Sequence, residues 1–167
     1  KGGEKINLEQ YAKIVNKFLK NKKAKIIFEP GRFIIGNSSI LITKIIYIKK
    51  SNRKNFIILD AGMNNLMRPA LYDAHHEIVP LKKSAGTLRG NIEFVGPVCE
   101  SSDKFLNKNK FSKIKEGDYI GIENVGAYGM SLSSNYNSRP IIAEIMVHRS
   151  KHRIIRKRQS LENLVNN

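Results

Sequence analysis

The residues with the clearest capacity for chemistry lie in four short polar clusters. One of them, "GPVCESSD" (residues 96–103), places the only cysteine of the chain, Cys99, next to Glu100 in a loop led by glycine and proline. A free cysteine usually behaves as a small buried hydrophobe, so a thiol in a polar loop is either a core residue at the loop's border or a reactive group. With one cysteine there is no internal disulfide, which favours a reducing compartment, by default the cytoplasm, and leaves the thiol free to react.

The other three clusters combine charged or phenolic side chains with turn residues. They are "FEPGRF" (28–33), "DAGMNNLMRPALYDAHHEIVP" (60–80) and "GAYGMSLSSNYNSRP" (126–140). Each has an ordinary explanation when taken alone. The first reads as a charged hairpin turn, and Arg68 and Tyr72, four residues apart, read as a surface pair on a helix. Single clusters therefore leave the chemistry undecided.

The N-terminal region has the pattern of an α/β layer. Residues 7–21, "NLEQYAKIVNKFLKN", carry apolar side chains at the three- and four-residue spacing of an amphipathic helix, with Asn7 as its N-cap. The following "AKIIFEPGR" is a short apolar run that ends in Glu-Pro-Gly, which predicts a buried strand ended by a turn. A single helix and strand cannot close a sheet of their own, so we expect this region to belong to a larger domain whose remainder lies upstream.

From Phe33 onward the sequence predicts a β domain. Short β-branched runs separated by glycine, asparagine, serine and proline are typical of a sandwich or barrel of mainly antiparallel strands. These runs are residues 38–50, 55–62, 77–83, 92–98, 118–125 and 140–148. Residues 126–140 alternate little and contain many small side chains, which predicts a loop or a short helix.

The charge of the chain is strongly positive, with 30 Lys+Arg against 14 Asp+Glu and a formal net charge of +16. Such a balance suggests a nucleic-acid surface, but the charges are spread thinly, and aromatic residues are not interleaved with them as in a base-stacking platform. The basic run "HRSKHRIIRKR" (148–158) is explained equally well as a solvated face. No apolar run approaches the roughly 20 residues of a membrane helix. We therefore expect neither a nucleic-acid nor a membrane partner.

Taken together and in this order, the four clusters resemble the diaminopimelate decarboxylase family of pyridoxal-phosphate enzymes. The resemblance extends from the helix at Asn7 to "RKRQSLENL" near the end of the chain. Members of that family pair an N-terminal β/α barrel with a C-terminal β domain. The resemblance thus implies an α+β fragment, in which residues 1–32 are the last helix and strand of the TIM-like barrel and residues 33–167 are the C-terminal β domain.

The resemblance also implies an activity and a cofactor. The family converts meso-2,6-diaminopimelate into L-lysine and carbon dioxide, the last step of lysine biosynthesis, with pyridoxal 5'-phosphate and no metal. The residues that match its cofactor-binding positions are Glu29, Pro30, Gly31, Arg32 and Tyr128. Glu29 is the candidate carboxylate that keeps the pyridine nitrogen protonated, which the cofactor requires in order to accept electrons.

For the substrate, the resemblance implies contacts with Arg32, Arg68, Tyr72, Glu100 and Tyr128. An arginine fork and a phenol suit a distal carboxylate, and Glu100 would accept from the distal ammonium. Cys99 would be the proton donor after decarboxylation, because a thiol is an acid with a tunable pKa. In the family, the residues that match Cys99 and Glu100 reach across a homodimer interface. The segment "SSNYNSRP" is expected to pack around the site without a catalytic role.

Two alternatives remain open. One is a related decarboxylase acting on ornithine or arginine, although such a substrate would leave Arg68 without a carboxylate partner. The other is an inactive remnant, since the family's cofactor-linked lysine lies upstream of this chain and none of its 21 lysines has a matching context. We expect His75 and His76 to be structural and Asp60 and Asp73 to be caps or supporting residues. The chain is expected to be inactive by itself.

Overall fold

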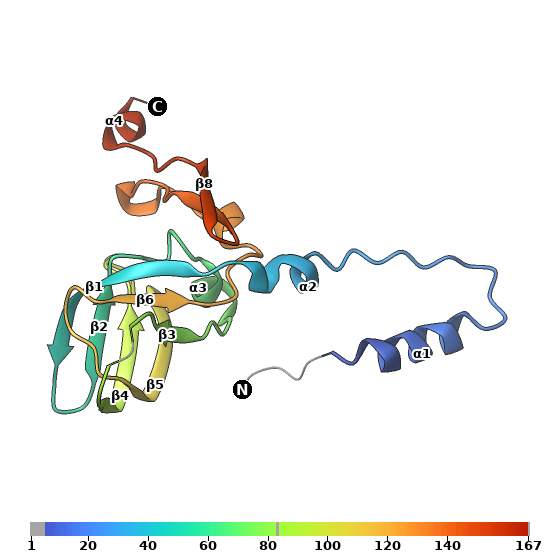
Figure 1. Ribbon diagram of the computed structural model, residues 1–167, viewed down its shortest axis with the longest axis horizontal. Helices are drawn as coiled ribbons and strands as arrows, with labels where there is room; N and C mark the ends of the chain where they lie inside the picture. Colours follow the sequence, from blue (N-terminus) through green and yellow to red (C-terminus); the bar gives the residue numbers. More distant parts are fainter. Residues whose placement is uncertain (1–5, 83, 167) are drawn as a thin grey trace. The chain divides into compact units, whose positions relative to one another are not determined.

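The computed structural model describes residues 6–82 and 84–166, and the chain divides into two compact units (Figure 1). The first unit ends at Pro30 and the second begins at Gly31. Each unit is described separately.

The first unit contains the helix α1 (Leu8–Leu19), as the apolar spacing predicts. Asn7 is its N-cap, because the Asn7 side-chain oxygen accepts a hydrogen bond from the backbone N–H of Gln10 at 3.0 Å. No residue of α1 is buried, and its apolar stripe remains largely exposed. The helix thus presents an amphipathic face that the rest of its own unit does not cover.

The strand predicted in "AKIIFEPGR" is not formed. Residues 23–30 have no regular secondary structure, and Ile27 is 76% exposed. The only ring contact of this segment joins Phe28 to Tyr11 of α1, edge to face, with 5.7 Å between ring centroids, among the residues described. A β-strand needs a hydrogen-bonding neighbour, and the described part of this unit contains no second extended segment to supply one.

The second unit is built around a six-stranded sheet in the order β3-β6-β1-β2-β4-β5. All neighbouring strands are antiparallel except β2 and β4, which are parallel. The strands are β1 (Leu41–Lys50), β2 (Asn55–Leu59), β3 (Ile78–Pro80), β4 (Thr87–Val95), β5 (Lys104–Ser112) and β6 (Tyr119–Ile122). The prediction of a mainly antiparallel β domain is therefore confirmed.

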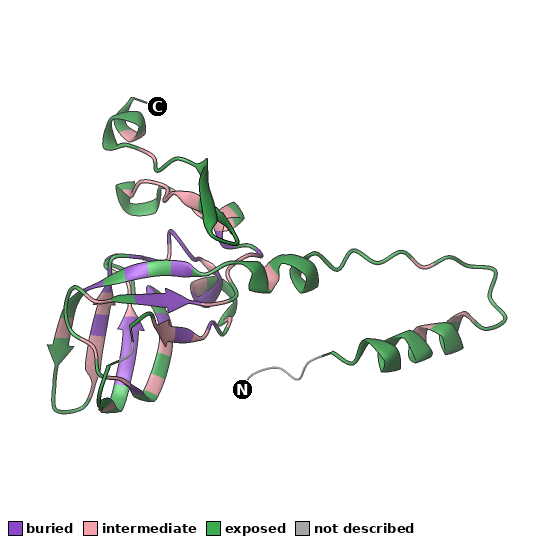
Figure 2. Ribbon diagram, in the orientation of Figure 1, coloured by how far each residue is buried: buried purple, intermediate pink, exposed green. Residues whose placement is uncertain are grey.

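The core of this unit lies on one face of the sheet. Strand β1 shows why, since buried and exposed residues alternate along its first half, as expected when one face is solvated (Figure 2). Phe94 and Phe111 pack edge to face at 5.0 Å. The fully buried aliphatic residues are Ile45, Ile57, Leu59, Leu66, Ile78, Ile92, Ile120 and Ile122.

The two outer strands of the sheet approach each other, so the sheet is nearly closed. Lys108 of β5 donates through its ammonium group to the backbone oxygen of Ile78 in β3 at 3.2 Å, and it also pairs with the carboxylate of Glu77. Strand β5 was not among the predicted strands, because its sequence, KFLNKNKFS, is rich in lysine and asparagine. Its buried residues, Phe105 and Phe111, lie six apart on the same face of the strand.

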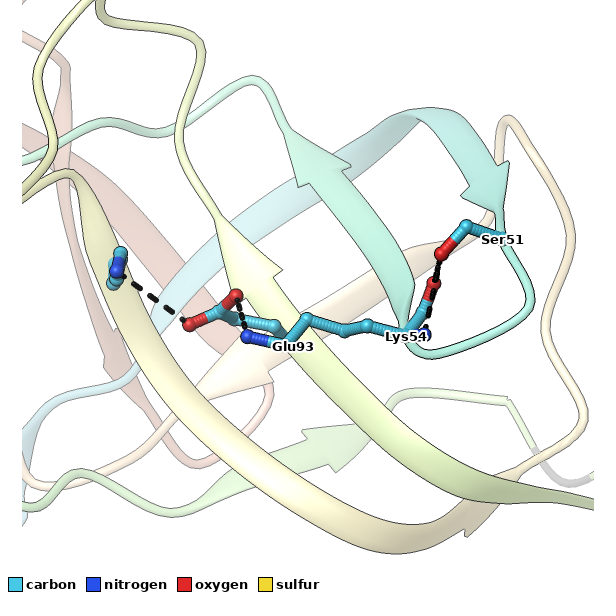
Figure 3. Close-up of polar contacts among 4 residues, drawn as sticks. Ser51, Lys54 and Glu93 are labelled. Atoms are coloured by element: carbon cyan, nitrogen blue, oxygen red, sulfur yellow. Dashed lines mark hydrogen bonds and ion pairs between the residues drawn. The ribbon is translucent and has the colours of Figure 1, made fainter.

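A buried carboxylate on β4 is neutralised from the neighbouring hairpin (Figure 3). Glu93 is 3% exposed, and the Lys54 ammonium lies 2.8 Å from one of its oxygens. Lys54 is held in a tight turn because the Ser51 hydroxyl donates to the Lys54 carbonyl at 2.7 Å and accepts from the Lys54 N–H at 3.2 Å. The turn between β1 and β2 therefore aims a cation at β4, where an unpaired buried carboxylate would be costly.

The remaining elements are short. They are α2 (Gly31–Ile35), η1 (Gly36–Ser38), α3 (Arg68–Tyr72), η2 (Met130–Leu132), η3 (Tyr136–Ser138), the hairpin of β7 (Glu144–His148) and β8 (Lys151–Arg156), and α4 (Leu161–Val165). The short helices η2 and η3 confirm the prediction for residues 126–140. The basic run 148–158 falls mostly on β8, which was not predicted. In the part of the chain that the structure covers, no helix is both long and apolar enough to cross a membrane.

Candidate active site

The helix α3 carries two of the predicted substrate residues, Arg68 and Tyr72. Pro69 lies in the first turn of this helix, where the proline ring fixes φ near the helical value. Its missing N–H costs nothing there, because the first N–H groups of a helix have no partner within the helix. The helix ends at Asp73, whose φ of 52° is left-handed and whose backbone N–H donates to the carbonyl of Pro69 at 3.1 Å. Asp73 is therefore a C-cap, one of the two roles expected for it.

Arg68 is a buried cation held by a histidine. It is 7% exposed, and its Nη1 lies 3.0 Å from Nε2 of His76, which is 1% exposed. The other ring nitrogen of His76, Nδ1, lies 2.9 Å from the backbone oxygen of Glu123. A carbonyl can only accept and a guanidinium can only donate, so Nδ1 carries the proton and Nε2 accepts. His76 is therefore a neutral imidazole between β6 and α3.

The rest of the Arg68 guanidinium is not satisfied by the described protein. Its Nε is buried without a hydrogen-bond partner, and none of the ion pairs among the described residues involves Arg68. Burial lowers the pKa of Arg68, and the positive charge of Arg32 lowers it further. A buried guanidinium with an open donor and no carboxylate is suited to bind an anionic ligand.

Tyr128 and Arg32 lie in the neighbourhood of Arg68. The guanidinium carbon of Arg68 is 5.9 Å from the centroid of the Tyr128 ring. Tyr128 has a left-handed φ of 61° and is half exposed. Two residues before it, the N–H of Gly126 donates to the carbonyl of Gly36 at 3.0 Å. A Cβ on Gly126 would lie 2.0 Å from a backbone oxygen of α2, so only glycine allows this approach. The contact brings the segment that carries Arg32 beside the one that carries Tyr128.

Cys99 is exposed in a loop that a buried aspartate closes. Asp103, 3% exposed, accepts from the backbone N–H groups of Val98 and Met63, each at 2.7 Å and each on its own oxygen. Burial raises the pKa of the Asp103 carboxyl, and these two hydrogen bonds oppose the rise. A Cβ on Gly96 would lie 2.2 Å from the same carboxylate, so glycine is required there. The alternative of Cys99 as a buried core residue is therefore wrong.

Glu100, next to Cys99, is oriented by a tyrosine that sequence reasoning assigned only to packing. The Tyr136 hydroxyl donates a short hydrogen bond to Oε1 of Glu100, and this bond raises the pKa of Tyr136. The segment around Tyr136 is anchored by Arg139, whose Nε donates to the side-chain oxygen of Asn64 at 3.2 Å. The turn at residues 60–65 thus holds both the Cys99 loop, through Met63, and the Tyr136 segment.

The predicted site residues fall into two groups on the second unit. Arg32, Arg68, Tyr72 and Tyr128 form the arginine group, since Arg68 interacts electrostatically with each of the others. Cys99 and Glu100 form the cysteine group with Tyr136. Among the described residues, no hydrogen bond or ion pair joins the two groups. Gly31 lies at the start of α2, and Glu29 and Pro30 are exposed in the other unit.

His76 was expected to be structural, and the structure connects it directly to Arg68, one of the predicted site residues. The sequence does contain a signal that His76 is buried. In an extended chain, residues two apart lie on the same face, and His76 precedes the buried Ile78 by two residues. His75 points the other way, is exposed and lies 3.4 Å from the carboxylate of Glu77. Asp60 is hydrogen-bonded to β1, because its carboxylate accepts from the Thr43 hydroxyl at 2.5 Å.

The described pockets do not contain these groups. One, of about 440 Å³, lies between α3 and β5 and includes Asp73, Glu93 and Lys104 in its walls. Another, of about 300 Å³, lies between residues 37–40 and Glu123 with Asn124.

Comparison with known proteins gives a consistent family. The model of the pyridoxal-dependent decarboxylase C-terminal sheet domain matches residues 18–126. A diaminopimelate decarboxylase of Zymomonas mobilis is 46% identical over 97% of this chain and 38% of its own length, and one of Helicobacter pylori is 47% identical over 96% of this chain and 40% of its own length. The chain therefore spans about two fifths of the length of these relatives.

Solved structures agree with the sequence comparison. The crystal structure of diaminopimelate decarboxylase from Helicobacter pylori complexed with L-lysine is similar with a TM-score of 0.88 and 44% identity, over 99% of this chain and 41% of that one. The matching domain is named a sheet domain, and the second unit is built around one six-stranded sheet. The chain belongs to the pyridoxal-dependent decarboxylases, whose C-terminal sheet domain it contains.

Proposed function

We propose that this chain is the C-terminal part of a diaminopimelate decarboxylase, which forms L-lysine and carbon dioxide from meso-2,6-diaminopimelate. The observation that carries the proposal is Arg68, a guanidinium 7% exposed, with a buried Nε that has no partner among the described residues. Diaminopimelate differs from ornithine and arginine in having a second carboxylate. That second carboxylate would pair with the buried Arg68 cation. Without such a partner, burying the charge would cost free energy.

In this proposal, the arginine group binds the distal end of the substrate. Arg68 offers its open donors to the distal carboxylate, and the exposed Tyr72 phenol, four residues later on α3, adds a second donor. Arg32 supplies a further positive charge close to Arg68. Glu100, oriented by Tyr136, accepts hydrogen bonds from the distal ammonium. A monocarboxylate diamine would then fail at Arg68 and a dicarboxylate without the ammonium would fail at Glu100.

The residues of this chain also fit the family's cofactor. Pyridoxal phosphate, when bound, supplies an acceptor for the electron pair of the breaking carbon–carboxylate bond. The half-exposed Tyr128 phenol and the exposed Arg32 guanidinium are donors of the kind an anionic phosphate requires. Glu29, with Pro30 and Gly31 beside it, is the proposed carboxylate partner of the pyridine nitrogen.

We assign the proton delivery to Cys99. Once carbon dioxide has left, the electron pair returns to the carbon, the Sγ–H bond of Cys99 breaks and a C–H bond forms. The resulting thiolate regains a proton from solvent, which its exposure allows. Because a thiol in this role must stay reduced, we place the reaction in the cytoplasm.

We further propose that the site is shared between two copies in a homodimer. The cysteine group has no described bond to the arginine group, so its two catalytic side chains are free to serve the site of the other copy. Residues 1–32 would complete the β/α barrel as its last helix and strand, and residues 33–167 would form the sheet domain. The uncovered apolar stripe of α1 and the exposed Ile27 agree with a place inside a larger domain.

The test uses the full-length protein with pyridoxal phosphate. Carbon dioxide release is measured with meso-diaminopimelate, ornithine and arginine as separate substrates, and lysine formation is measured with diaminopimelate. We expect turnover of diaminopimelate, and Arg68→Met should abolish the preference by raising KM for diaminopimelate about 100-fold. Turnover of ornithine or arginine in preference to diaminopimelate would refute the assignment, and a folded protein with bound cofactor that releases carbon dioxide from none of the three would indicate an inactive remnant.

A further inference from the structure

His76 contacts the group proposed to select the substrate and leaves that group's charge intact. It lies 1% exposed between β6 and α3, donates through Nδ1 to the Glu123 carbonyl at 2.9 Å and accepts from Arg68 Nη1 at 3.0 Å. The first bond holds the ring in place from the sheet, and the second holds one arm of the guanidinium. Nothing among the described residues holds the Arg68 Nε.

We infer that His76 is a positioning residue, which orients the Arg68 guanidinium so that its open donors face the distal carboxylate of the substrate. This inference rests on the proposed function. An arginine side chain has many rotamers, and fixing one of them before the substrate arrives removes an entropic cost from binding. A planar fork held at one nitrogen also keeps a fixed plane, which two-point recognition of a carboxylate requires.

The chemical type of the holding residue is important. An aspartate or glutamate at position 76 would pair with Arg68, satisfy its donors and compete with the substrate's carboxylate. A neutral imidazole accepts one hydrogen bond and leaves the full positive charge for the substrate. Because the Glu123 carbonyl can only accept, the proton of the neutral ring stays on Nδ1. Nε2 is then left as the acceptor for Arg68.

The arrangement also predicts a pH dependence. The charged and titratable groups facing His76 are Arg68, Arg32 and His75, and the sheet contributes the Glu123 carbonyl. Burial lowers the pKa of His76 below its usual 6.5, the charges of Arg68 and Arg32 and the neighbouring His75 lower it further, and the bond to Glu123 opposes them. Protonation would turn Nε2 into a donor facing the donor Nη1. Affinity for diaminopimelate is therefore complete above about pH 6.5 and is lost as the pH falls through the lowered pKa of His76.

The experiment compares two ligands in the full-length holoenzyme. KM for diaminopimelate reports on Arg68, while inhibition by 1,5-diaminopentane, which keeps the distal ammonium but has no carboxylate, serves as the internal reference. We expect His76→Leu to raise KM for diaminopimelate about tenfold or more and to change the inhibition constant of 1,5-diaminopentane less than about threefold. The matched control is His75→Leu, which removes the exposed neighbour and should leave the ratio of the two constants unchanged.

A second variant separates positioning from simple stability. His76→Gln retains one donor and one acceptor but does not titrate, so it should recover most of the affinity for diaminopimelate and lose the rise in KM at low pH. Equal weakening of both ligands by His76→Leu, or a low-pH rise in KM that persists unchanged in His76→Gln, would overturn the inference. Lysine formation by the unsubstituted protein reports on the proposed function separately.

Discussion

At the scale of single residues, each group combines one side chain that is proposed to face the ligand with one that contacts it. Arg68 has His76 as its support, and Glu100 has Tyr136. In both pairs the supporting side chain is uncharged, so the charge of the group that faces the ligand is not cancelled. This arrangement allows a site to recognise both the carboxylate and the ammonium of one substrate end, because neither recognising charge is consumed inside the protein.

The first prediction concerns Cys99. Replacing it by alanine removes the proposed acid, and we expect kcat for lysine formation to fall by about 10² to 10⁴ while KM changes little. The rate is measured by lysine release in steady state. Ser102→Ala, in the same loop and also exposed, is the control and should retain normal turnover. A kcat for Cys99→Ala within about threefold of normal would remove Cys99 from the mechanism.

The second prediction concerns Tyr136. Tyr136→Phe deletes only the hydroxyl that donates to Glu100, so the carboxylate keeps its charge but loses its orientation. We expect KM for diaminopimelate to rise by about three- to tenfold, the size of a hydrogen bond to a charged group at an exposed site. Tyr119→Phe, another exposed tyrosine, on β6, is the comparison and should leave KM unaltered. An unchanged KM in Tyr136→Phe would mean that Glu100 does not depend on this bond.

At the scale of elements, the turn at residues 60–65 organises the site. It follows β2 and leads into α3, it receives the Cys99 loop through the bond from Met63 to Asp103, and it receives the Tyr136 segment through Arg139 and Asn64. The backbone N–H of Ser134 also donates to the Asn64 carbonyl at 2.9 Å. Two segments far apart in sequence, the Cys99 loop and the Tyr136 segment, are thus fixed to one turn by hydrogen bonds that are partly buried.

The third prediction tests that arrangement at Asp103. In Asp103→Asn one carboxylate oxygen becomes an NH₂ group, so one of the two backbone donors, Met63 or Val98, faces a donor instead of an acceptor. We expect a loss of about 1–3 kcal/mol in the free energy of unfolding. Denaturant unfolding measures this loss, and hydrogen exchange at the Val98 and Met63 amides should become faster.

The control for Asp103 is Asp118→Asn. The Asp118 carboxylate also accepts a backbone N–H, from Lys115 at 2.8 Å, but this turn is largely exposed and makes one such bond. Its loss should therefore cost well under the value for Asp103, because water can replace the acceptor. Equal costs at both positions would show that the Cys99 loop does not depend on burial of Asp103.

At the scale of the whole molecule, the two groups carry different halves of the proposed chemistry. The arginine group recognises the distal carboxylate, and the cysteine group supplies the acid and the contact for the distal ammonium. If they act on the same substrate from different copies, every site needs one group from each copy. A symmetric dimer then contains two such sites.

The fourth prediction is that two impaired variants restore each other when diaminopimelate is held near the KM of the unsubstituted protein. Arg68→Met and Cys99→Ala are mixed as unfolded or exchanging subunits and allowed to reassociate. Half of the dimers are then mixed, and each mixed dimer has one site with both defects and one with neither, so activity should recover to about a quarter of normal. Recovery is measured as lysine formation, and a mixture no more active than its components would show that each site is formed within one copy.

The sequence alone determined the local features of this protein. The spacing of apolar residues in α1, the β-branched runs of β1, β2 and β6, the proline that begins α3 and the glycine-led loop of Cys99 are all encoded within a few residues. The resemblance of the four clusters led to the family to which the chain belongs. Strand β5 was missed because its lysine and asparagine residues weaken the alternation on which strand prediction depends, and β8 was missed because it is rich in basic residues.

Only the tertiary structure decided which side chains support the site. His76 and Glu123 are 47 residues apart in the chain, and Glu100 and Tyr136 are 36 apart. Such pairings arise from sheet order and from the turn at residues 60–65, and no local pattern records them. The run before Pro30 shows that a local pattern alone is not sufficient. Its apolar sequence predicts a strand, but a strand forms only when a neighbouring strand supplies hydrogen bonds.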